Sequence, residues 1–192
     1  FDQKAVTAFK KRNNLEDKKI ILFSGRISEE KGIFQIIQAL DLVLREIPNA
    51  LLLVAGSGAR LDNVNLPIRS LGWLGHEEMK IAYSACDVLV VPSLIFDSFP
   101  TVILEAMAAK KPVVGTCFGG TPEIIIDGET GYIINPYDIK TMADRITDLL
   151  KNPEKAGEFG KKGYERARDF FSLKHQAETY LSFYVSRKHA LG

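Results

Sequence analysis

Two cations, Arg26 and Lys31, follow the first apolar run of the chain and precede a segment with helical period. Arg26 stands directly after Gly25, and Lys31 directly before Gly32, where the helical pattern begins. The amides and dipole of a helix N-terminus favour an anion, and two fixed cations would add to that preference. We expect a diphosphate to suit this loop. The alternative is that both cations are solvated and paired with the neighbouring residues Glu29–Glu30.

A single carboxylate in an apolar helix is the second feature that could do chemistry. The loop 97–101 enters the segment 102–109, in which Glu105 is the only polar residue. A solvated helix face would carry several polar residues, so we expect Glu105 to be at least partly buried and to bind donors such as two ribose hydroxyls. The alternative is a structural carboxylate paired with an Arg or Lys of a neighbouring loop. The backbone amides of Ser98 to Thr101 are expected to face the same ligand.

Other motifs are incomplete. Gly56-Ser57-Gly58 begins a dinucleotide fingerprint, but Leu61 stands where the third Gly belongs, and no Gly-Lys pair is followed by Ser or Thr as in a Walker motif. Nicotinamide cofactors and nucleoside triphosphate hydrolysis are therefore disfavoured. The histidines form no metal or catalytic cluster, and we expect each to cap a helix or lie at the surface: His76, His175 and His189. Cys86 and Cys117 are expected to be reduced core thiols.

The composition is that of an ordinary globular domain. Of the 192 residues, 46% are hydrophobic and 26% charged, and the formal net charge is +1. Because charges of both signs are interspersed, we expect no nucleic-acid partner. No apolar run approaches the roughly 20 residues that cross a bilayer, so no transmembrane segment is expected. We predict one domain over 1–192. The chain opens on Phe1 without a Met or secretory segment, so we expect it to belong to a longer protein.

Short β-rich runs alternate with longer helical segments, which predicts a doubly wound parallel sheet with helices on both faces. The predicted strands are Ile20–Ser24, Ala50–Ala55, Leu71–Trp73, Val88–Pro92, Val113–Thr116 and Gly131–Ile134. The predicted helices are Gly32–Glu46, Glu77–Ala85, Thr101–Lys110, Thr121–Ile126, Ile139–Leu150 and two more between Asn152 and Arg187. In such sheets ligands bind at the carboxyl ends of the strands, where the loops described above lie.

Taken together, the motifs resemble the C-terminal domain of the retaining glycosyltransferases of family 4, which have the GT-B fold. The resemblance covers nearly the whole chain and rests on Gly25-Arg26 through Lys31-Gly32, Asp97 through Met107-Ala108, Pro112 through Val114, Gly119 through Glu123, and Asp127 through Gly131. It implies one Rossmann-like half of a GT-B fold that binds a nucleotide diphosphate sugar. It further implies retaining transfer of a hexosyl group to a glycan or lipid-linked acceptor.

The resemblance also implies site residues. Arg26 and Lys31 would contact the donor diphosphate beside Gly25 and stabilise the leaving group, Glu105 would bind the ribose, and Asp97 would lie near the transferred sugar. Asp97 departs from the usual Glu and is one methylene shorter, which leaves its contact to the sugar open. The backbone of Leu74 is the candidate for reading the base. Phosphates and sugar would meet Ser98, Phe99, Pro100 and Thr101.

The family uses no essential metal, so we expect no cofactor, and a UDP-sugar is favoured over a GDP-sugar as donor. The acceptor would bind through an N-terminal domain that has no counterpart in this sequence, so the chain alone is expected to be inactive. A last helix over 172–188 would pack on that domain and otherwise expose Leu181, Phe183 and Tyr184. The expected location is cytoplasmic, or peripheral at the inner membrane face for a lipid acceptor. The alternatives are a non-catalytic nucleotide-sugar-binding module and, less favoured, a GT-B epimerase or phosphorylase.

Overall fold

A six-stranded, fully parallel sheet forms the centre of the computed structural model, which describes residues 2–62 and 64–190, with side chains as far as Ser182. The strand order is β3-β2-β1-β4-β5-β6, the order of a Rossmann-like sheet. The strands are β1 (Lys19–Ser24), β2 (Ala50–Ala55), β3 (Ile68–Gly72), β4 (Val88–Val91), β5 (Val113–Thr116) and β6 (Gly131–Ile134). The predicted fold class is therefore confirmed.

The strands that lie inside the sheet were predicted to within one residue, because their side chains are buried on both faces and form unbroken apolar runs. The third strand is the exception. β3 begins at Ile68 rather than Leu71, and its residues are half-buried or exposed because it lies at the edge of the sheet. Its apolar signal is correspondingly weak.

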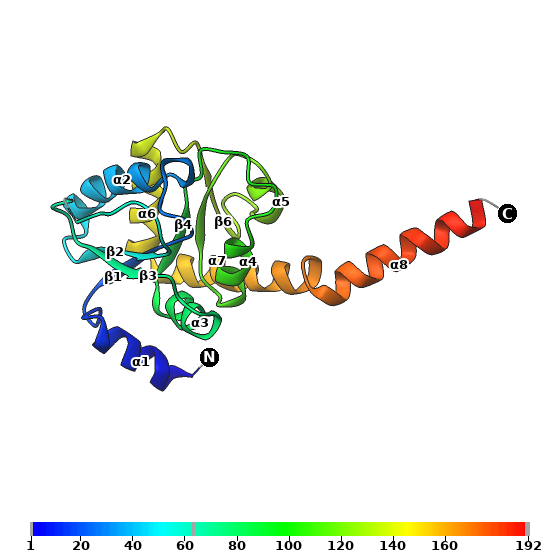
Figure 1. Ribbon diagram of the computed structural model, residues 1–192, viewed down its shortest axis with the longest axis horizontal. Coiled ribbons are helices and arrows are strands. Elements are labelled where there is room, and N and C mark those ends of the chain that lie inside the picture. The colour runs from blue at the N-terminus through cyan, green and yellow to red at the C-terminus, as the bar shows by residue number, and fades with distance from the viewer. Residues whose placement is uncertain (1, 63, 191–192) are drawn as a thin grey trace.

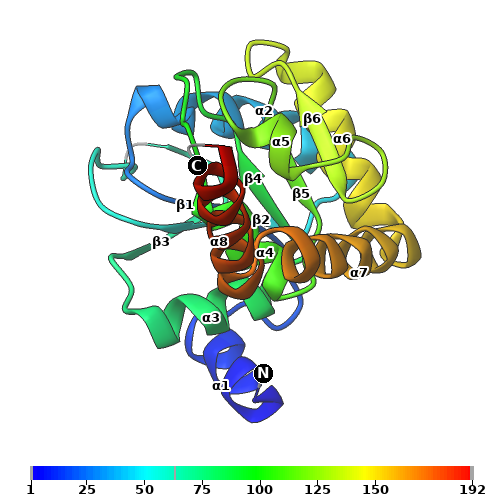
Figure 2. The ribbon, with the colours of Figure 1, turned by 90° about the vertical axis from the view of Figure 1, so that its right-hand side faces the viewer.

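Helices cover both faces of the sheet (Figure 2). An apolar cluster of buried side chains lies on each face. The helices α2 (Ile33–Glu46) and α6 (Ile139–Lys151) lie on one face. On the other face are α1 (Gln3–Arg12), α3 (His76–Ala85), α4 (Thr101–Ala108) and α5 (Thr121–Ile124). The helix α7 (Pro153–Phe170) packs along the β6 side, with Phe159 in the first cluster and Ala167 against the second.

The helix α1 was not predicted from the sequence. Asp2 caps it by accepting a hydrogen bond from the Lys4 amide, and only Val6 and Phe9 are buried, one turn apart, against α3. Two apolar contacts in a segment rich in Lys and Arg give little periodic signal. The N-cap and the i, i+3 apolar pair are the features that could have revealed this helix.

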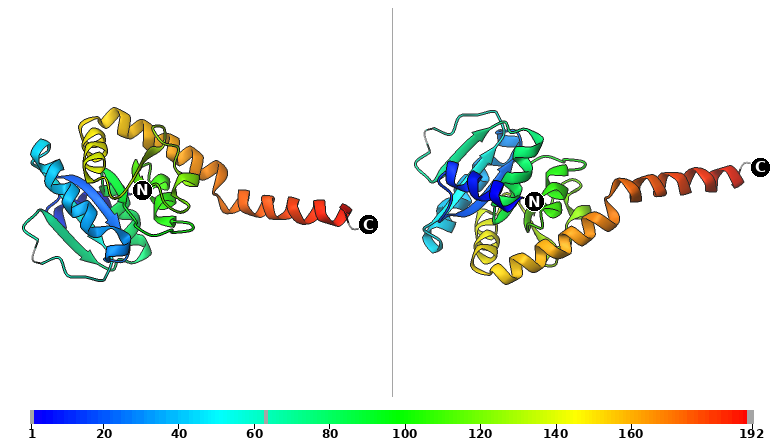
Figure 3. Two further views of the ribbon diagram at one scale, coloured as in Figure 1. Left: turned by 90° about the horizontal axis from the view of Figure 1, so that it is seen from above. Right: turned by 90° about the horizontal axis from the view of Figure 1, so that it is seen from below.

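The last helix, α8 (Leu173–Ala190), projects away from the rest of the molecule (Figure 1, Figure 3). Leu173, Tyr180 and Leu181 are exposed on it, as was predicted for Leu181. Phe183 and Tyr184 lie outside the described side chains. None of the described helices is long and apolar enough to cross a lipid bilayer.

Two smaller predictions concern cysteine and histidine. Cys86 is buried as expected, but Cys117 is exposed, so the prediction of a core thiol at that position is wrong. Cys117 lies one residue beyond β5, in the loop where the chain leaves the core. His76 is the exposed first residue of α3, and Gly75 is the N-cap. His76 therefore lies at the surface, which was one of its two predicted positions, and does not cap the helix. His175 is exposed, and the side chain of His189 lies outside the described ones.

Candidate functional site

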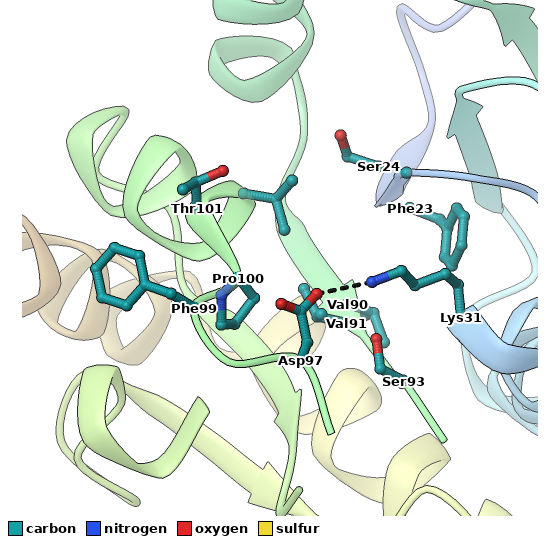
Figure 4. Close-up of a pocket in the computed structure, with 12 residues that line it drawn as sticks. Phe23, Ser24, Lys31, Val90, Val91, Ser93, Asp97, Phe99, Pro100 and Thr101 are labelled. Carbon is teal, nitrogen blue, oxygen red and sulfur yellow. Dashed lines mark hydrogen bonds and ion pairs between the residues drawn. The ribbon is translucent and has the colours of Figure 1, made fainter. Parts of the chain in front are cut away.

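A cavity of about 290 Å³ lies at the carboxyl ends of β1 and β4, where the strand order of the sheet reverses (Figure 4). Crevices at such switch points are where open α/β sheets bind ligands. The predicted site residues Gly25, Lys31, Asp97, Phe99, Pro100 and Thr101 contribute to its walls. The rest of the lining is Phe23, Ser24, Val90, Val91, Ser93 and Val102.

Lys31 and Asp97 form an ion pair inside this cavity (Figure 4). The Lys31 Nζ lies 2.7 Å from an Asp97 carboxylate oxygen, and the two side chains are 25% and 28% exposed. The alternative that Lys31 is a solvated residue paired with a neighbouring Glu is therefore wrong. Because the pair is only partly desolvated, Lys31 remains accessible to an anion that enters the cavity.

Arg26 lies outside the cavity wall in this structure. Its guanidinium is 3.2 Å from the Glu30 carboxylate, and both side chains are more than half exposed. This is the surface pair that the sequence allowed as an alternative. Exposed pairs of this kind contribute little, so Arg26 can leave Glu30 at small cost. Its predicted contact with a diphosphate stays a prediction.

Close backbone packing fixes the two loops that form the cavity. The Leu94 amide donates to the Glu30 carbonyl across 2.8 Å, which joins the loops after β1 and β4. Gly32 has φ +76°, and a Cβ on it would lie 1.9 Å from the Pro92 carbonyl oxygen. A side chain at this position would force the two loops apart. Gly32 therefore allows Lys31 to reach the cavity.

The loop after β5 supports Asp97 from behind. The Gly120 amide donates to the Asp97 carbonyl across 2.8 Å. A Cβ on Gly119 would lie 2.2 Å from that same carbonyl oxygen, and a Cβ on Gly120 would lie 2.1 Å from the Ser98 carbonyl oxygen. The pair Gly119-Gly120 thus sets the path of the chain through Asp97 and Ser98.

Two helices begin beside the cavity without a side-chain cap. Gly32 is the N-cap of α2 and Pro100 that of α4, and neither makes a side-chain cap hydrogen bond. Uncapped first-turn amides are suited to bind an anion. Pro100 has no N–H, so of the loop 98–101 only Ser98, Phe99 and Thr101 can donate backbone hydrogen bonds to a ligand. Ser98 is exposed beside the cavity rather than part of its lining.

Glu105 is exposed, so the prediction that this carboxylate is at least partly buried is wrong. The helix α4 buries Ile103, Ala106 and Met107 and turns a narrow face with Thr101 and Glu105 to solvent. This exposed face consists of small residues apart from Glu105, so it leaves no polar pattern in the sequence. Glu105 lies one turn beyond Thr101, on the outer side of the helix that begins at the cavity.

Leu74 follows β3 and is half-buried, and it does not line the cavity. The neighbouring glycines after β2 have a packing role. A Cβ on Gly56 would lie 1.8 Å from the Gly25 carbonyl oxygen, and one on Gly58 would lie 2.2 Å from the Ile27 carbonyl oxygen. These glycines, which begin a dinucleotide fingerprint in the sequence, allow the loops after β1 and β2 to touch.

Sequence reasoning missed the polar residues that end the two central strands. Ser24 is the last residue of β1, and Ser93 follows β4 and is only 1% exposed. Both line the cavity. Their position at strand ends on either side of the switch point is the signal that could have found them. Among the residues that the structure describes, no group of three His, Cys, Asp or Glu side chains is placed to hold a metal ion.

The chain belongs to the family described as "Glycosyl transferases group 1", whose sequence model matches residues 6–166. It is 33% identical to Spore coat protein SA of Bacillus subtilis over 97% of this chain and 54% of that protein. It is 28% identical to a GDP-mannose-dependent phosphatidylinositol monomannoside mannosyltransferase of Mycolicibacterium smegmatis over 88% of this chain and 48% of that enzyme. The chain thus spans about half the length of these relatives.

The fold also matches solved structures. The Anabaena protein Alr3699/HepE, crystallised with UDP-glucose, superposes with a TM-score of 0.84 over 95% of this chain and 54% of that chain, at 21% identity. At this identity the match shows the fold alone. The chain is therefore a Rossmann-like domain of the kind that forms the C-terminal half of GT-B glycosyltransferases.

Proposed function

We propose that this chain binds the nucleotide diphosphate sugar donor of a retaining hexosyltransferase in the cavity between the loops after β1 and β4. The observation that carries the proposal is that Lys31 and the uncapped N-terminus of α4 line one cavity, with the uncapped start of α2 directly after Lys31. A cation and the first-turn amides of a helix match the charge of a diphosphate. Membership in the glycosyltransferase family supports the class of reaction.

Most of the predicted site residues have a role in this proposal. Lys31 binds the diphosphate, and Arg26 joins it by exchanging Glu30 for a phosphate oxygen. The amides of Phe99 and Thr101 bind the phosphates and sugar. Asp97 accepts from hydroxyls of the transferred sugar once the diphosphate takes over Lys31. Beyond the cavity, Glu105 binds the ribose on the outer face of α4, and the backbone of Leu74 reads the base.

The proposed transfer retains the configuration at the anomeric carbon. The bond from that carbon to the diphosphate oxygen breaks while the acceptor oxygen attacks from the same face, and the acceptor proton passes to the departing phosphate. The positive charges and amides that bind the diphosphate stabilise the negative charge that develops there. No protein base is required in this domain. The acceptor, a glycan or a lipid-linked sugar, would bind mainly outside this chain.

We favour a UDP-sugar as donor, with a GDP-sugar as the competing possibility. The Anabaena protein of the same fold was crystallised with UDP-glucose, whereas the mycobacterial relative is named for its dependence on GDP-mannose. Both nucleotides present the same diphosphate to Lys31. The choice between them therefore depends on the base and the loop that holds Leu74.

Thermal unfolding with UDP-glucose, UDP-N-acetylglucosamine and GDP-mannose tests the proposal. A ligand at 100 times its Kd adds about 2.7 kcal/mol, which raises the Tm of a domain this size by roughly 5 to 10 °C. Lys31→Ala and Glu105→Ala should abolish the shift. Lys162→Ala is the matched control, because Lys162 is exposed and paired with Glu158 on α7. A wild-type chain that no nucleotide sugar shifts, or a Lys31→Ala variant that shifts like the wild type, would refute the proposal. Sugar transfer by the whole protein would distinguish an enzyme from a binding module.

A further inference from the structure

Three aromatic side chains contact one another at the carboxyl edge of the sheet, on the loops that follow β4, β5 and β6. The ring centroids of Phe96 and Phe118 are 5.7 Å apart, and those of Phe118 and Tyr137 are 6.3 Å apart. Phe96 is 82% exposed, Tyr137 is 64% exposed, and Phe118 between them is half-buried. We call these three residues the aromatic strip. None of them has a role in the proposed binding of the donor.

Hydrogen bonds fix the backbone that carries the aromatic strip. The Phe118 amide donates to the Thr116 Oγ1 across 3.3 Å, and the Tyr137 amide donates to the Asn135 Oδ1 across 3.0 Å. Each exposed ring keeps apolar area in water, and burial of that area would be favourable. Exposed apolar groups that gather at one place on fixed loops commonly mark a binding surface.

The aromatic strip begins beside the proposed sugar contact. Phe96 directly precedes Asp97, and Phe118 directly precedes Gly119. A Cβ on Gly119 would lie 2.2 Å from the Asp97 carbonyl oxygen, so the loops after β4 and β5 touch at Asp97. The strip is therefore continuous with the part of the site that is proposed to contact the transferred sugar.

The order of the strands indicates what the aromatic strip would contact. In the proposed complex the nucleotide extends from the cavity at β1 and β4 toward Leu74, which follows β3 at one edge of the sheet. The strip extends from Asp97 in the opposite direction, over β5 to β6 at the other edge. A group that lies beside the transferred sugar on the side away from the nucleotide is the acceptor.

A sugar ring matches the chemistry of the aromatic strip. The faces of a pyranose carry C–H groups and its rim carries hydroxyls, so stacking on an aromatic ring buries apolar area and leaves the rim free for hydrogen bonds. The strip has donors for that rim. In the part of the chain that the structure describes, neither the Tyr137 hydroxyl nor the Asn135 NH2 group donates to another residue.

We propose that the aromatic strip binds a pyranose ring of the acceptor and holds it beside the sugar that Asp97 contacts. The inference rests on the proposed function, because it takes Asp97 as the contact to the transferred sugar. It narrows the acceptor to a molecule that presents a sugar ring. It also assigns part of acceptor binding to this domain.

Amide NMR shifts of the 192-residue chain test the inference. UDP or GDP is added first and should shift the amides of 25–31. Maltotriose, mannotriose or triacetylchitotriose then follows at millimolar concentrations, and at least one of them should shift the amides of 96–97, 118–119 and 137. Phe96→Ala and Tyr137→Ala should each weaken trisaccharide binding about fivefold, the size of one lost aromatic contact, and should change nucleotide affinity much less.

Tyr180→Ala is the matched control, because Tyr180 is an aromatic side chain that is 58% exposed on α8, outside the aromatic strip. Its loss should leave trisaccharide binding intact. If the nucleotide binds and no trisaccharide does, or if Phe96→Ala weakens both ligands equally, the inference is overturned while the proposed function stands. Lower self-association of Phe96→Ala with unchanged trisaccharide affinity would assign the strip to a protein contact and overturn it too. A wild-type chain that binds neither UDP nor GDP would overturn the proposed function and this inference together.

Discussion

Lys31 and Asp97 are separated by 66 positions in the chain, yet their charged groups lie 2.7 Å apart in the cavity. In the proposed donor complex the diphosphate and Asp97 compete for the same ammonium group. A negative charge beside Lys31 therefore opposes the binding of a nucleotide that lacks a sugar. This competition is a consequence of the position of Asp97 and gives a direct test of it.

Asp97→Asn should bind UDP about fivefold more tightly than the wild type, which corresponds to roughly 1 kcal/mol for a partly exposed pair. The amide keeps the size of the carboxylate but neither neutralises Lys31 nor repels phosphate. UDP-glucose should gain less, because Asp97 is the proposed contact to the sugar. Isothermal titration of both ligands measures the difference. Weaker binding of UDP by Asp97→Asn would show that the carboxylate does not compete with the diphosphate.

Gly120→Ala should disrupt the site through the backbone. A Cβ at this position would meet the Ser98 carbonyl oxygen at 2.1 Å, so the loop 97–100 must move. We expect at least about a tenfold loss of UDP affinity and a destabilisation of about 1 to 3 kcal/mol, typical of overpacking. Urea unfolding and nucleotide titration measure the two effects.

Gly157→Ala is the control for this substitution. Gly157 lies within α7, and a Cβ there would have no atom within 4 Å. Alanine should therefore raise the free energy of unfolding by about 0.5 to 1 kcal/mol and leave UDP binding unchanged. If Gly120→Ala bound UDP as well as Gly157→Ala does, the support of Asp97 by the loop after β5 would be unimportant.

At the scale of elements, Asp148 on α6 joins three parts of the fold. Its carboxylate accepts hydrogen bonds from Tyr132 on β6 at 2.6 Å and from Lys155 on α7 at 2.7 Å. Burial raises the pKa of Asp148, but the hydrogen bonds from Lys155 and Tyr132 outweigh it, so the pKa lies below its ordinary value. The ionised form of Asp148 therefore stabilises the contact of α6 with α7 and β6.

Because the pKa is lower in the folded than in the unfolded chain, this stability is fully present above about pH 4, the ordinary Asp value, and is lost as the pH falls through the folded pKa. Asp148→Asn should cost about 1 kcal/mol at pH 7. The same variant should lose less stability than the wild type between pH 5 and pH 2. Urea unfolding at several pH values tests this, and parallel pH curves for the two proteins would contradict the assignment.

At the scale of the whole molecule, α8 differs from every other helix. It leaves the domain after Phe171 and exposes Leu173, Tyr180 and Leu181 (Figure 1). We propose, as the family resemblance implies, that this helix packs on the N-terminal domain of a whole enzyme. Exposed apolar groups on a projecting helix favour association with another surface.

A chain that ends at Phe171 should have a Tm within about 3 °C of that of the 192-residue chain, since α8 adds little buried area to the domain. It should also self-associate less than the 192-residue chain. Differential scanning calorimetry and sedimentation velocity measure the two properties. A large fall in Tm would mean that α8 stabilises the domain directly, and unchanged association would mean that its apolar groups are not the cause.

The sequence by itself determined the fold class, the inner strands and the loops that carry the site. Strands such as β2 are buried on both faces, so every residue of the strand is apolar and the sequence shows an unbroken apolar run. The motif around Lys31 and Asp97 lies directly after such runs, so its place at the carboxyl edge follows from strand direction. These features depend on the spacing of apolar residues along the chain and on strand direction, and both can be read from residues that are neighbours in the sequence.

Only the tertiary structure decided which side chains meet. The pairing of Lys31 with Asp97, the approach of Tyr83 to Ser24 and the exposure of Glu105 all depend on how distant segments pack. Strand order brings the loops after β1 and β4 together, and no local pattern states that order. The outer face of α4 is likewise exposed because α3 and α7 leave it uncovered, although its residue types indicate burial. The type of a residue indicates whether its side chain tends to be buried. Which other side chain it contacts depends on the packing of the whole chain.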